Sequence, residues 1–537
     1  MKKISINTES AFMFFIGFVF IVWSVVFIYN SSFITIDGNR SYSLFDDAMI
    51  SMRYAWKFSH GYGLVWNPGE YVQGYSNLLM TLLMSISTLL FSKTNAVLSI
   101  QISGIFFMLA VAYFNMRIAG HIFQFADYRR AFIKVLSFLF GLSYYPLAYW
   151  SLMGMETGLF SVLLLLSVLF ALRFTQSRNI KFLALTSVSL GFAFLTRNES
   201  IIPAFFIWLY VVWKTIQQEK DYRYFRFLLP VGLYSLFVFG QLSFQYFYYG
   251  EALPNTYILK LTGMSLLLRI RYGVVFIEPF FRETGIVLIA SVLSVLAFVN
   301  FFRSEKMLIF SLVWSMIFYQ IYIGGDAWDY WRITSPIMPL AMILYVEIIM
   351  SIINRLFFRL SAVANLLFDI NYVEVFAKLV MLFLLLGGVF VVNFRFLPEI
   401  LLKSKPYQTD SNKVNVNTAA VLNDILADNA TIGVIWAGAI PYYIDNRVVD
   451  FLGKSDRYIA NLPPRVSGYW SRPGHNKYDL NYSIIHLRPT YIQRTRWDED
   501  DLSGWVAMHY VKAEYFGMDF YFLKNSPDVL WDKVKLP

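Results

Sequence analysis

Long apolar runs alternate with short polar segments along most of the chain, up to about residue 395. A helix needs about 20 apolar residues to cross a bilayer. We therefore predict a polytopic α-helical membrane protein with about 11 transmembrane helices, two of them short. The expected spans are 11–29, 96–115, 131–150, 157–172, 182–196, 201–213, 227–248, 284–302, 307–323, 337–353 and 375–394.

One further apolar stretch, 77–91, is short and ends a few residues before the next span begins. Loops rich in Lys and Arg stay in the cytoplasm. The basic residues between the spans share one side with Lys2 and Lys3 only if 77–91 does not cross, so we expect an outer interfacial helix there. The basic residues concerned are Arg117, Arg129, Arg130, Arg173, Arg178, Lys181, Lys214, Lys220, Arg223, Arg226, Arg303, Lys306, Arg355 and Arg359.

This assignment predicts a cytoplasmic N-terminus and an outward-facing tail. The outward loops are then 30–76, 150–156, 197–200, 249–283 and 324–336. These loops contain the unusual concentrations of polar residues, so we expect a functional site on the outer side.

The pattern changes at about residue 395, where long apolar runs give way to short alternating ones. The sequence "NTAAVLNDILADN" has helical spacing, whereas "TIGVIWAG", "RVVDFLG", "YSIIHL", "TYIQR" and "MDFYFLK" are typical of strands. We therefore divide the chain into a transmembrane domain, 1–395, whose first outer loop is 30–95, and an extracytoplasmic α/β domain, 396–537.

Composition supports a membrane protein and excludes several other classes. The chain is 57% hydrophobic and only 15% charged, whereas soluble domains have about 25% charged residues. Its net charge of +10 is spread between the apolar runs and forms no basic face for nucleic acid. The absence of cysteine excludes disulfides and thiolate sites, and the 5 histidines form no close ligand pair.

The first outer loop contains adjacent carboxylates, Asp46 and Asp47, in "LFDDAMISMRYA". A carboxylate inside hydrocarbon costs about 2.5 to 3.5 kcal/mol, so the pair belongs at the water boundary. The stretch predicts a helix that runs to about Ser59 and ends before Gly61. It would lie on the bilayer with its acidic end turned to a cavity.

Two interpretations of Asp46 remain open at this point. Ser43 and Asp46 fit a capping pattern, in which the acid only satisfies the first amides of its own helix. Alternatively, Asp46 accepts a proton from a substrate. Asp46 and Asp47 point about 100° apart on a helix and are expected to do different work.

The remaining outward loops supply carboxylates, cations and aromatic rings. Carboxylates suit sugar hydroxyls, aromatic faces suit the C–H side of a sugar ring, and cations suit a phosphate group. Single residues have plainer explanations, since Arg197 could snorkel and Glu156 could face the positive end of a helix. The candidate substrate-binding residues are Arg53, Glu70, Tyr75, Asn77, Glu156, Arg197, Asn255, Lys260, Asp326 and Arg332.

A polyprenyl-phosphate sugar needs this combination of groups at one membrane surface. The lipid requires an apolar cleft, and cations stabilise the phosphate as the leaving group. An acid orients or deprotonates the acceptor hydroxyl. Acid pairs near phosphate also hold Mg²⁺ or Ca²⁺, so a divalent cation is possible and no cofactor is assigned.

The ordered motifs of the chain resemble one known family. They are "DDAMISMRYA", "GYGLVWNPGEYVQGYSN", "GMET", "LTRNE", "LPNTYILK", "GGD" with a following Arg, and the tail blocks "WAGAIPYY", "VVDFLGKSD" and "RPGHNKYD". This order is similar to that of the mycobacterial terminal β-(1→2)-arabinofuranosyltransferase and its bacterial relatives, within the GT-C superfamily of membrane glycosyltransferases. The resemblance covers nearly the whole chain.

The resemblance implies transfer of a sugar, in the best-known case arabinofuranose, from a polyprenyl-phosphate donor. It implies an inner-membrane protein with a periplasmic tail and an envelope glycan, glycolipid, lipopolysaccharide or pilin-like acceptor. The family's catalytic acidic pair matches Asp46 and Asp47. Its later motif positions match Glu156, Arg197, Lys260, Asp326 and Arg332, and His475 in the tail is a further candidate for the site.

Two other classes of function are weighed against the transferase. A transporter or flippase of lipid-linked sugars would have polar or broken helices near the bilayer midplane, whereas the acids here cluster outside the spans. An envelope scaffold would act through its tail alone. For the transferase, we expect the tail to shape the acceptor side without doing chemistry.

Overall fold

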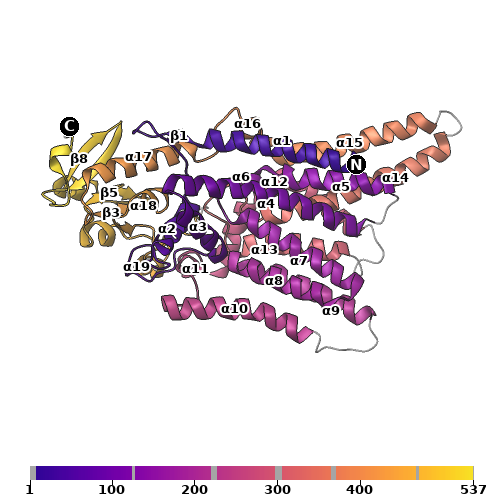
Figure 1. The fold of residues 1–537 in the computed structure, drawn as a ribbon, viewed down its shortest axis with the longest axis horizontal. Helices are drawn as coiled ribbons and strands as arrows, with labels where there is room; N and C mark the ends of the chain where they lie inside the picture. Colours follow the sequence, from indigo (N-terminus) through magenta and orange to yellow (C-terminus); the bar gives the residue numbers. More distant parts are fainter. Residues whose placement is uncertain are drawn as a thin grey trace, which may run out of the picture.

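The computed structural model describes residues 8–123, 127–218, 227–296, 305–364, 370–466 and 471–535. Long helices run side by side, and a smaller domain with a β-sheet lies at one end of them (Figure 1). Several basic residues of the predicted cytoplasmic side lie outside the described residues: Lys2, Lys3, Lys220, Arg223, Arg226 and Arg303.

Each of the eleven predicted spans overlaps one helix or, for 131–150, two helices; the end of the span 284–302, from residue 297, lies outside the described residues. Eight helices of the described chain are long and apolar enough to cross a membrane, or nine if the bent pair α5 and α6 is one span; α8 and α13 fall outside this set. The chain is a multi-pass membrane protein. The helices are α1 (Thr8–Ser31), α4 (Lys93–Ile122), α5 (Asp127–Ser143) with α6 (Tyr145–Leu152), α7 (Thr157–Ser177), α8 (Ile180–Thr196), α9 (Ile201–Gln218), α10 (Leu228–Tyr249), α12 (Leu266–Leu296), α13 (Glu305–Tyr322), α14 (Met338–Ala364) and α15 (Ile370–Asn393).

Two spans differ from the predicted form. α5 and α6 meet at an angle of 57°, and Pro146 lies in the first turn of α6, where a missing amide hydrogen interrupts a continuous helix. α12 begins at Leu266 rather than near 284. The predicted loop 249–283 is therefore shorter than expected, and it contains the short helix α11 (Asn255–Leu261).

The first outer loop folds into α2 (Asp46–Ser59) and α3 (Leu78–Leu90), after a short hairpin of β1 (Phe33–Ile34) and β2 (Arg40–Ser41). α3 has 13 residues, too few to span a membrane, and lies with α2 at the end of the bundle that carries the sheet (Figure 1). The expectation that α2 lies on the bilayer is wrong. Most of its side chains are buried, because the C-terminal domain packs against the face of α2 that was expected to be in water.

The C-terminal domain contains a five-stranded sheet in the order β4-β3-β5-β9-β8. β3 pairs in parallel with β4 and β5, whereas β9 is antiparallel to β5 and β8. The strands are β3 (Thr431–Val434), β4 (Arg447–Asp450), β5 (Tyr491–Ile492), β8 (Tyr510–Tyr515) and β9 (Met518–Leu523); a separate pair is β6 (Arg496–Trp497) and β7 (Asp500–Asp501). The predicted α/β domain is present.

Helices surround this sheet and connect it to the membrane domain. They are α16 (Leu397–Ile400), α17 (Thr409–Ile425), α18 (Ala439–Tyr443), α19 (Arg457–Asn461) and α20 (Ser503–His509). The predicted strand "YSIIHL" is wrong, since Asn481–His486 forms a π-helix. Its side chains pack in the domain core with the helical period, which a short apolar run does not reveal.

Candidate functional site

Asp46 and Asp47 begin α2, at the junction of the membrane and C-terminal domains. The Oδ1 atom of Asp46 accepts a hydrogen bond of 3.0 Å from the amide of Ala439, the first residue of α18. The N-cap of α2 itself is Phe45, which makes no side-chain capping bond. Asp46 therefore caps a helix of the other domain, and the predicted capping of its own helix is wrong.

This contact requires a glycine at position 438, in the C-terminal domain. A Cβ atom at Gly438 would lie 2.0 Å from the backbone oxygen of Asp46. Only the absence of a side chain lets α18 approach α2 so closely. The other carboxylate oxygen of Asp46, Oδ2, is buried and has no hydrogen-bond partner among the described residues.

Asp47 is paired with two cations. It accepts hydrogen bonds of 2.7 Å from Arg332 and 2.7 Å from Lys454, one on each carboxylate oxygen. Burial alone would raise the pKa of Asp47, but Lys454 and then Arg332 outweigh it and hold this pKa well below its usual range. Asp47 is therefore a fixed anion.

Arg332 also binds Asp326 through two parallel hydrogen bonds of 2.5 and 2.7 Å. This fork geometry fixes the guanidinium firmly. The pKa of Arg332 is raised, because Asp326 and Asp47 together outweigh the effect of burial. Arg332 thus links the loop before α14 to the beginning of α2.

The loop that carries Arg332 has an unusual backbone. Tyr330 and Trp331 have φ values of 69° and 55°, in the left-handed region that bulky residues avoid. The hydroxyl of Tyr330 donates to Glu399 at 2.6 Å, and the indole nitrogen of Trp331 donates to Glu283 at 2.8 Å. These two carboxylates hold the strained loop in place.

Lys260 of α11 belongs to the same cluster. Burial and then Arg332 lower its pKa, while Asp326 and Asp47 oppose the shift. Within the described chain its ammonium group makes no hydrogen bond and no ion pair. Lys260 is therefore a cation available to a ligand.

Glu156 and Arg197 form a second group beside this cluster. Arg197 donates to Glu156 at 2.5 Å and makes a short hydrogen bond to Glu199. Asn77 donates to the other oxygen of Glu156 at 2.8 Å. Glu156 makes no capping bond to α7, so the pairing with Arg197 accounts for both residues.

Two predicted site residues, Arg53 and Asn255, bind backbone of the C-terminal domain instead. Arg53 is almost fully buried and donates to the carbonyl oxygens of Pro441 and Ile444, among others. Asn255 donates to the carbonyl of Lys454 at 3.1 Å. Arg53 joins the two domains, and Asn255 holds the loop that presents Lys454 to Asp47.

Two more predicted residues lie outside the cluster. Glu70 pairs with Arg447 at the surface, at 2.7 Å. The hydroxyl of Tyr75 lies 3.1 Å from that of Tyr249, within a buried aromatic cluster. Both stabilise the packing of the first outer loop.

The C-terminal domain contributes Lys454 and His475 to the cluster. His475 is 4% exposed, and the centroid of its ring lies 5.5 Å from that of the Trp328 ring. His475 was predicted as a site residue and Lys454 was not, although Lys454 lies in the tail motif "VVDFLGKSD". Nothing in the pattern distinguishes this lysine from the other basic residues of the tail.

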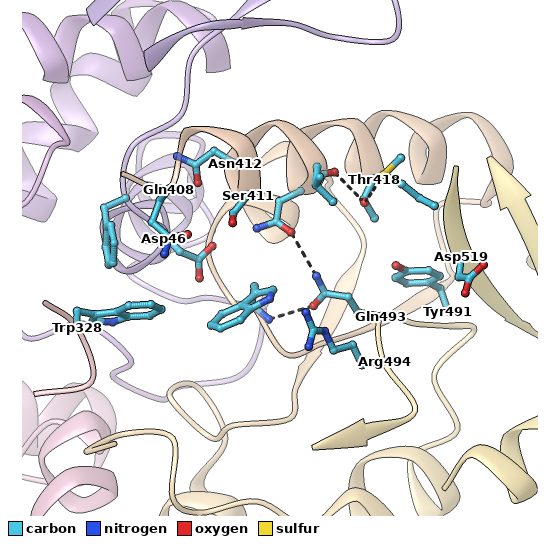
Figure 2. Close-up of a pocket in the computed structure, with 15 residues that line it drawn as sticks. Asp46, Trp328, Gln408, Ser411, Asn412, Thr418, Tyr491, Gln493, Arg494 and Asp519 are labelled. Carbon is cyan, nitrogen blue, oxygen red and sulfur yellow. Dashed lines mark hydrogen bonds between the residues drawn. The ribbon is translucent and has the colours of Figure 1, made fainter. Parts of the chain in front are cut away.

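Two cavities adjoin the cluster. The first, of about 450 Å³, lies between α2, α17 and the sheet. Figure 2 shows Asp46 and Trp328 at one end and Tyr491 and Asp519 at the other. Its remaining lining is mainly polar and aromatic: Phe45, Gln408, Ser411, Asn412, Val414, Asn415, Thr418, Trp436, Gln493, Arg494 and Met518.

The second cavity, of about 260 Å³, lies where the membrane helices end. Its charged lining consists of two cations and two acids: Arg197, Lys260, Glu199 and Asp326. Ile202 of α9 and Tyr319 of α13 are among its apolar lining residues. This cavity therefore combines cations with a wall that continues into membrane-spanning helices.

Asp46 differs electrostatically from its neighbour. Burial raises the pKa of Asp46, and Lys454 and the amide of Ala439 only partly offset it. The charge of Asp47 adds to the increase. Asp46 can therefore take up a proton more easily than Asp47, which is held ionised.

The donor set does not fit a divalent cation. Among the described residues, no group of three or more His, Cys, Asp or Glu side chains is placed to hold a metal. Both oxygens of Asp47 bind cationic side chains, and both oxygens of Asp326 bind Arg332. Lys454 and Arg332 occupy the positions that Mg²⁺ or Ca²⁺ would take.

Comparisons with known sequences match only the tail. Residues 403–530 match the model of a domain of unknown function, DUF8728. No curated protein sequence matches the chain significantly.

Solved structures share the fold of nearly the whole chain. ArnT from Cupriavidus metallidurans, in the apo state, has a TM-score of 0.52 and 13% identity over 82% of this chain and 86% of its own. The same protein bound to undecaprenyl phosphate has a TM-score of 0.51 and 11% identity, and the match covers 81% of this chain and 85% of that protein. The Archaeoglobus fulgidus oligosaccharyltransferase, tethered with an acceptor peptide, has a TM-score of 0.56 and 10% identity, and the match covers 98% of this chain and 74% of that protein.

These likenesses confirm the predicted fold. The chain shares its fold with ArnT and the archaeal oligosaccharyltransferase, and in it a helical membrane domain is followed by a C-terminal α/β domain. The narrower resemblance to an arabinofuranosyltransferase stays a prediction.

Proposed function

We propose that the protein is a glycosyltransferase that uses a polyprenyl-phosphate sugar as its donor. The observation that carries this proposal is the position of Asp46 and Asp47 between two different cavities. One cavity lies at the ends of membrane helices and contains Lys260, a cation with no partner in the described chain. The other is polar, aromatic and bounded by the C-terminal domain. The shared fold with ArnT and the archaeal oligosaccharyltransferase supports this class of reaction.

The second cavity suits the lipid phosphate of the donor. Lys260 is a cation without a partner in the described chain, and Arg197 lies in the same lining. A positive charge at this position stabilises the phosphate as it leaves. Ile202 and Tyr319 belong to helices of the membrane domain, so this side of the cavity suits the polyprenyl chain.

The first cavity suits the acceptor. Asp46 lines this cavity, and its Oδ2 atom has no hydrogen-bond partner among the described residues. The raised pKa of this acid favours proton uptake. The acceptor oxygen bonds to the anomeric carbon as the bond from that carbon to the phosphate oxygen breaks. The electron pair of that bond leaves with the polyprenyl phosphate, and the hydroxyl proton passes to Asp46.

Asp47 plays a different part in this proposal. Its fixed charge aligns Arg332 and Lys454 beside the reacting groups. Two cationic side chains then supply the positive charge, and no step requires a metal.

The finer assignments rest on the sequence. The motif order supports a pentofuranose such as arabinofuranose as the sugar and an envelope glycan, glycolipid or protein as the acceptor. The basic loops support an outward-facing site, a cytoplasmic N-terminus and a domain boundary near 395.

Purified protein in lipid nanodiscs, supplied with radiolabelled undecaprenyl-phosphoryl arabinofuranose and envelope glycan, tests the proposal. We expect release of undecaprenyl phosphate with transfer of label to the glycan, and loss of both in Asp46→Asn. Asp37→Asn, an exposed acid of the same outer loop, is the matched control and is expected to retain activity. If a panel of furanose and pyranose donors gave neither release nor transfer, the proposal would fail.

A further inference from the structure

His475 and the tryptophans around it form a feature that the proposed reaction has not used. The histidine is 4% exposed, and neither ring nitrogen has a hydrogen-bond partner in the described chain. Its ring meets that of Trp328 edge-on, with 5.5 Å between the ring centroids. The corresponding centroid distances are 6.3 Å to Trp436 and 6.5 Å to Trp497. A buried polar group without a partner is unfavourable, and a ligand bound at these nitrogens would offset that cost.

The position of His475 places it between the two cavities. Trp328 and Trp436, which flank its ring, line the cavity that holds Asp46. Pro473, two residues before it, lines the cavity that holds Lys260. His475 itself lines neither cavity, but its neighbours line one cavity each, so it lies between the proposed acceptor position and the proposed lipid-phosphate position.

The chain holds this loop firmly against the membrane domain. Lys477 donates to the carbonyl of Ile258 and the hydroxyl of Thr262, at the end of the helix that carries Lys260. A Cβ atom at Gly474 would lie 3.2 Å from Cε of Lys260. His475 and Lys260 are thus fixed relative to one another by direct packing.

The chemistry of this position fits hydroxyl groups rather than phosphate. Burial, and then the charge of Lys454, lower the pKa of His475 well below its usual range, so the imidazole is neutral. A neutral imidazole donates at one nitrogen and accepts at the other. A sugar hydroxyl also donates and accepts, whereas a phosphate only accepts and is better matched by Lys260. The tryptophan rings offer flat apolar walls to the carbon face of a sugar.

We infer that His475, with Trp328 and Trp436, forms the subsite that holds the sugar being transferred. This inference rests on the proposed glycosyltransferase function and makes the C-terminal domain part of the donor site. His475 binds the sugar; it does not take the proton.

The test compares two lipids, undecaprenyl phosphate with and without a sugar, for binding to the full-length protein. The donor panel contains arabinofuranose, ribofuranose, galactofuranose, glucose and mannose. The parent protein is expected to bind one sugar-bearing lipid at least tenfold more tightly than the bare lipid phosphate. His475→Phe keeps a ring among the tryptophans but has no ring nitrogen. We expect it to lose this tenfold gain in affinity for the sugar-bearing lipid, which we call the increment, while binding the bare lipid phosphate normally.

Two further variants complete the experiment. His475→Gln restores a donor and an acceptor but no base, and it is expected to recover part of the increment and of the transfer rate. His509→Phe is the control, because His509 stacks on Trp505 in the same domain, away from both cavities.

Three results would overturn the inference. They are equal binding of both lipids by the parent across the panel, an unchanged increment in His475→Phe, or full sugar binding with more than a hundredfold loss of transfer in His475→Gln. Failure of the proposed function itself would look different, because the parent would then bind no undecaprenyl phosphate and transfer no sugar.

Discussion

Lys454 of the C-terminal domain donates a hydrogen bond of 2.7 Å to Asp47, the second residue of α2 in the membrane domain. The two residues are separated by 407 positions in the chain. The ion pair is buried, so neither domain completes the acidic site without the other. The expectation that the tail only shapes the acceptor side therefore understates its contribution to the geometry.

Substituting Lys454 tests this dependence directly. In Lys454→Met, the buried charge of Asp47 keeps only Arg332, and removal of one partner from a buried pair costs about 3 to 5 kcal/mol. We expect a lower thermal midpoint and at least a tenfold loss of transfer. Lys405→Met, which breaks an exposed ion pair with Asp410, serves as control in the same thermal and transfer assays. Equal effects of the two substitutions would contradict the assigned role.

Asp46→Asn separates proton transfer from helix capping. Asparagine retains the oxygen that accepts from Ala439, but it cannot take up a proton at the free position. General base catalysis is worth about 10² to 10⁴ in rate. We expect a stably inserted protein with transfer reduced at least a hundredfold and donor binding largely retained. Transfer near the parent rate would move the catalytic role to Asp47 or Glu156.

The raised pKa of Asp46 also predicts a pH dependence. The base must be ionised, so kcat/KM should fall on the acid side with an apparent pKa above 3.8, the ordinary value for aspartate. Because the folded pKa is higher than the unfolded one, ionisation of Asp46 costs stability as the pH rises through it. Asp46→Asn is therefore expected to be at least as stable as the parent at neutral pH, measured by thermal unfolding. An acid limb at or below 3.8 would argue against Asp46 as the base.

Chelation is expected to leave the reaction unchanged. Arg332 and Lys454 already neutralise the carboxylates that a divalent cation would need. Transfer measured in EDTA should equal transfer measured with Mg²⁺ or Ca²⁺. Loss of activity in EDTA, with recovery on adding one of these ions, would show that the two cations give way to a metal during catalysis.

Glu399 is expected to act through the loop that presents Arg332. It accepts from the hydroxyls of both Tyr145 and Tyr330, and left-handed backbone of the kind found at Tyr330 costs about 1 to 3 kcal/mol. In Glu399→Ala the loop should relax, raising the KM for the donor and lowering the thermal midpoint. Glu514→Ala, an exposed acid of β8, is the control. A variant with unchanged donor KM would show that the loop keeps its conformation without Glu399.

Local composition was enough to predict the membrane fold, because burial of apolar helices in a bilayer depends on it. All eleven runs overlap helices, and the change of pattern near residue 395 precedes the α/β domain. The helix from Asp46 to Ser59 was also predicted, since the glycine that follows its end is a local signal, but the capping pattern at its beginning was misleading. A short run such as "YSIIHL" failed, because strand and helix cannot be distinguished over so few residues.

Which polar residues meet could not be predicted in this way, because it depends on how the two domains pack. Arg53 and Arg332 are equally plausible phosphate ligands in the sequence, yet Arg53 is used on backbone carbonyls and Arg332 on two carboxylates. Lys454 gave no local signal at all. Its role arises because Gly438 lets α18 approach the beginning of α2, bringing the tail onto the membrane domain. Such long-range contacts depend on the packing of whole domains, which no local pattern of residues encodes.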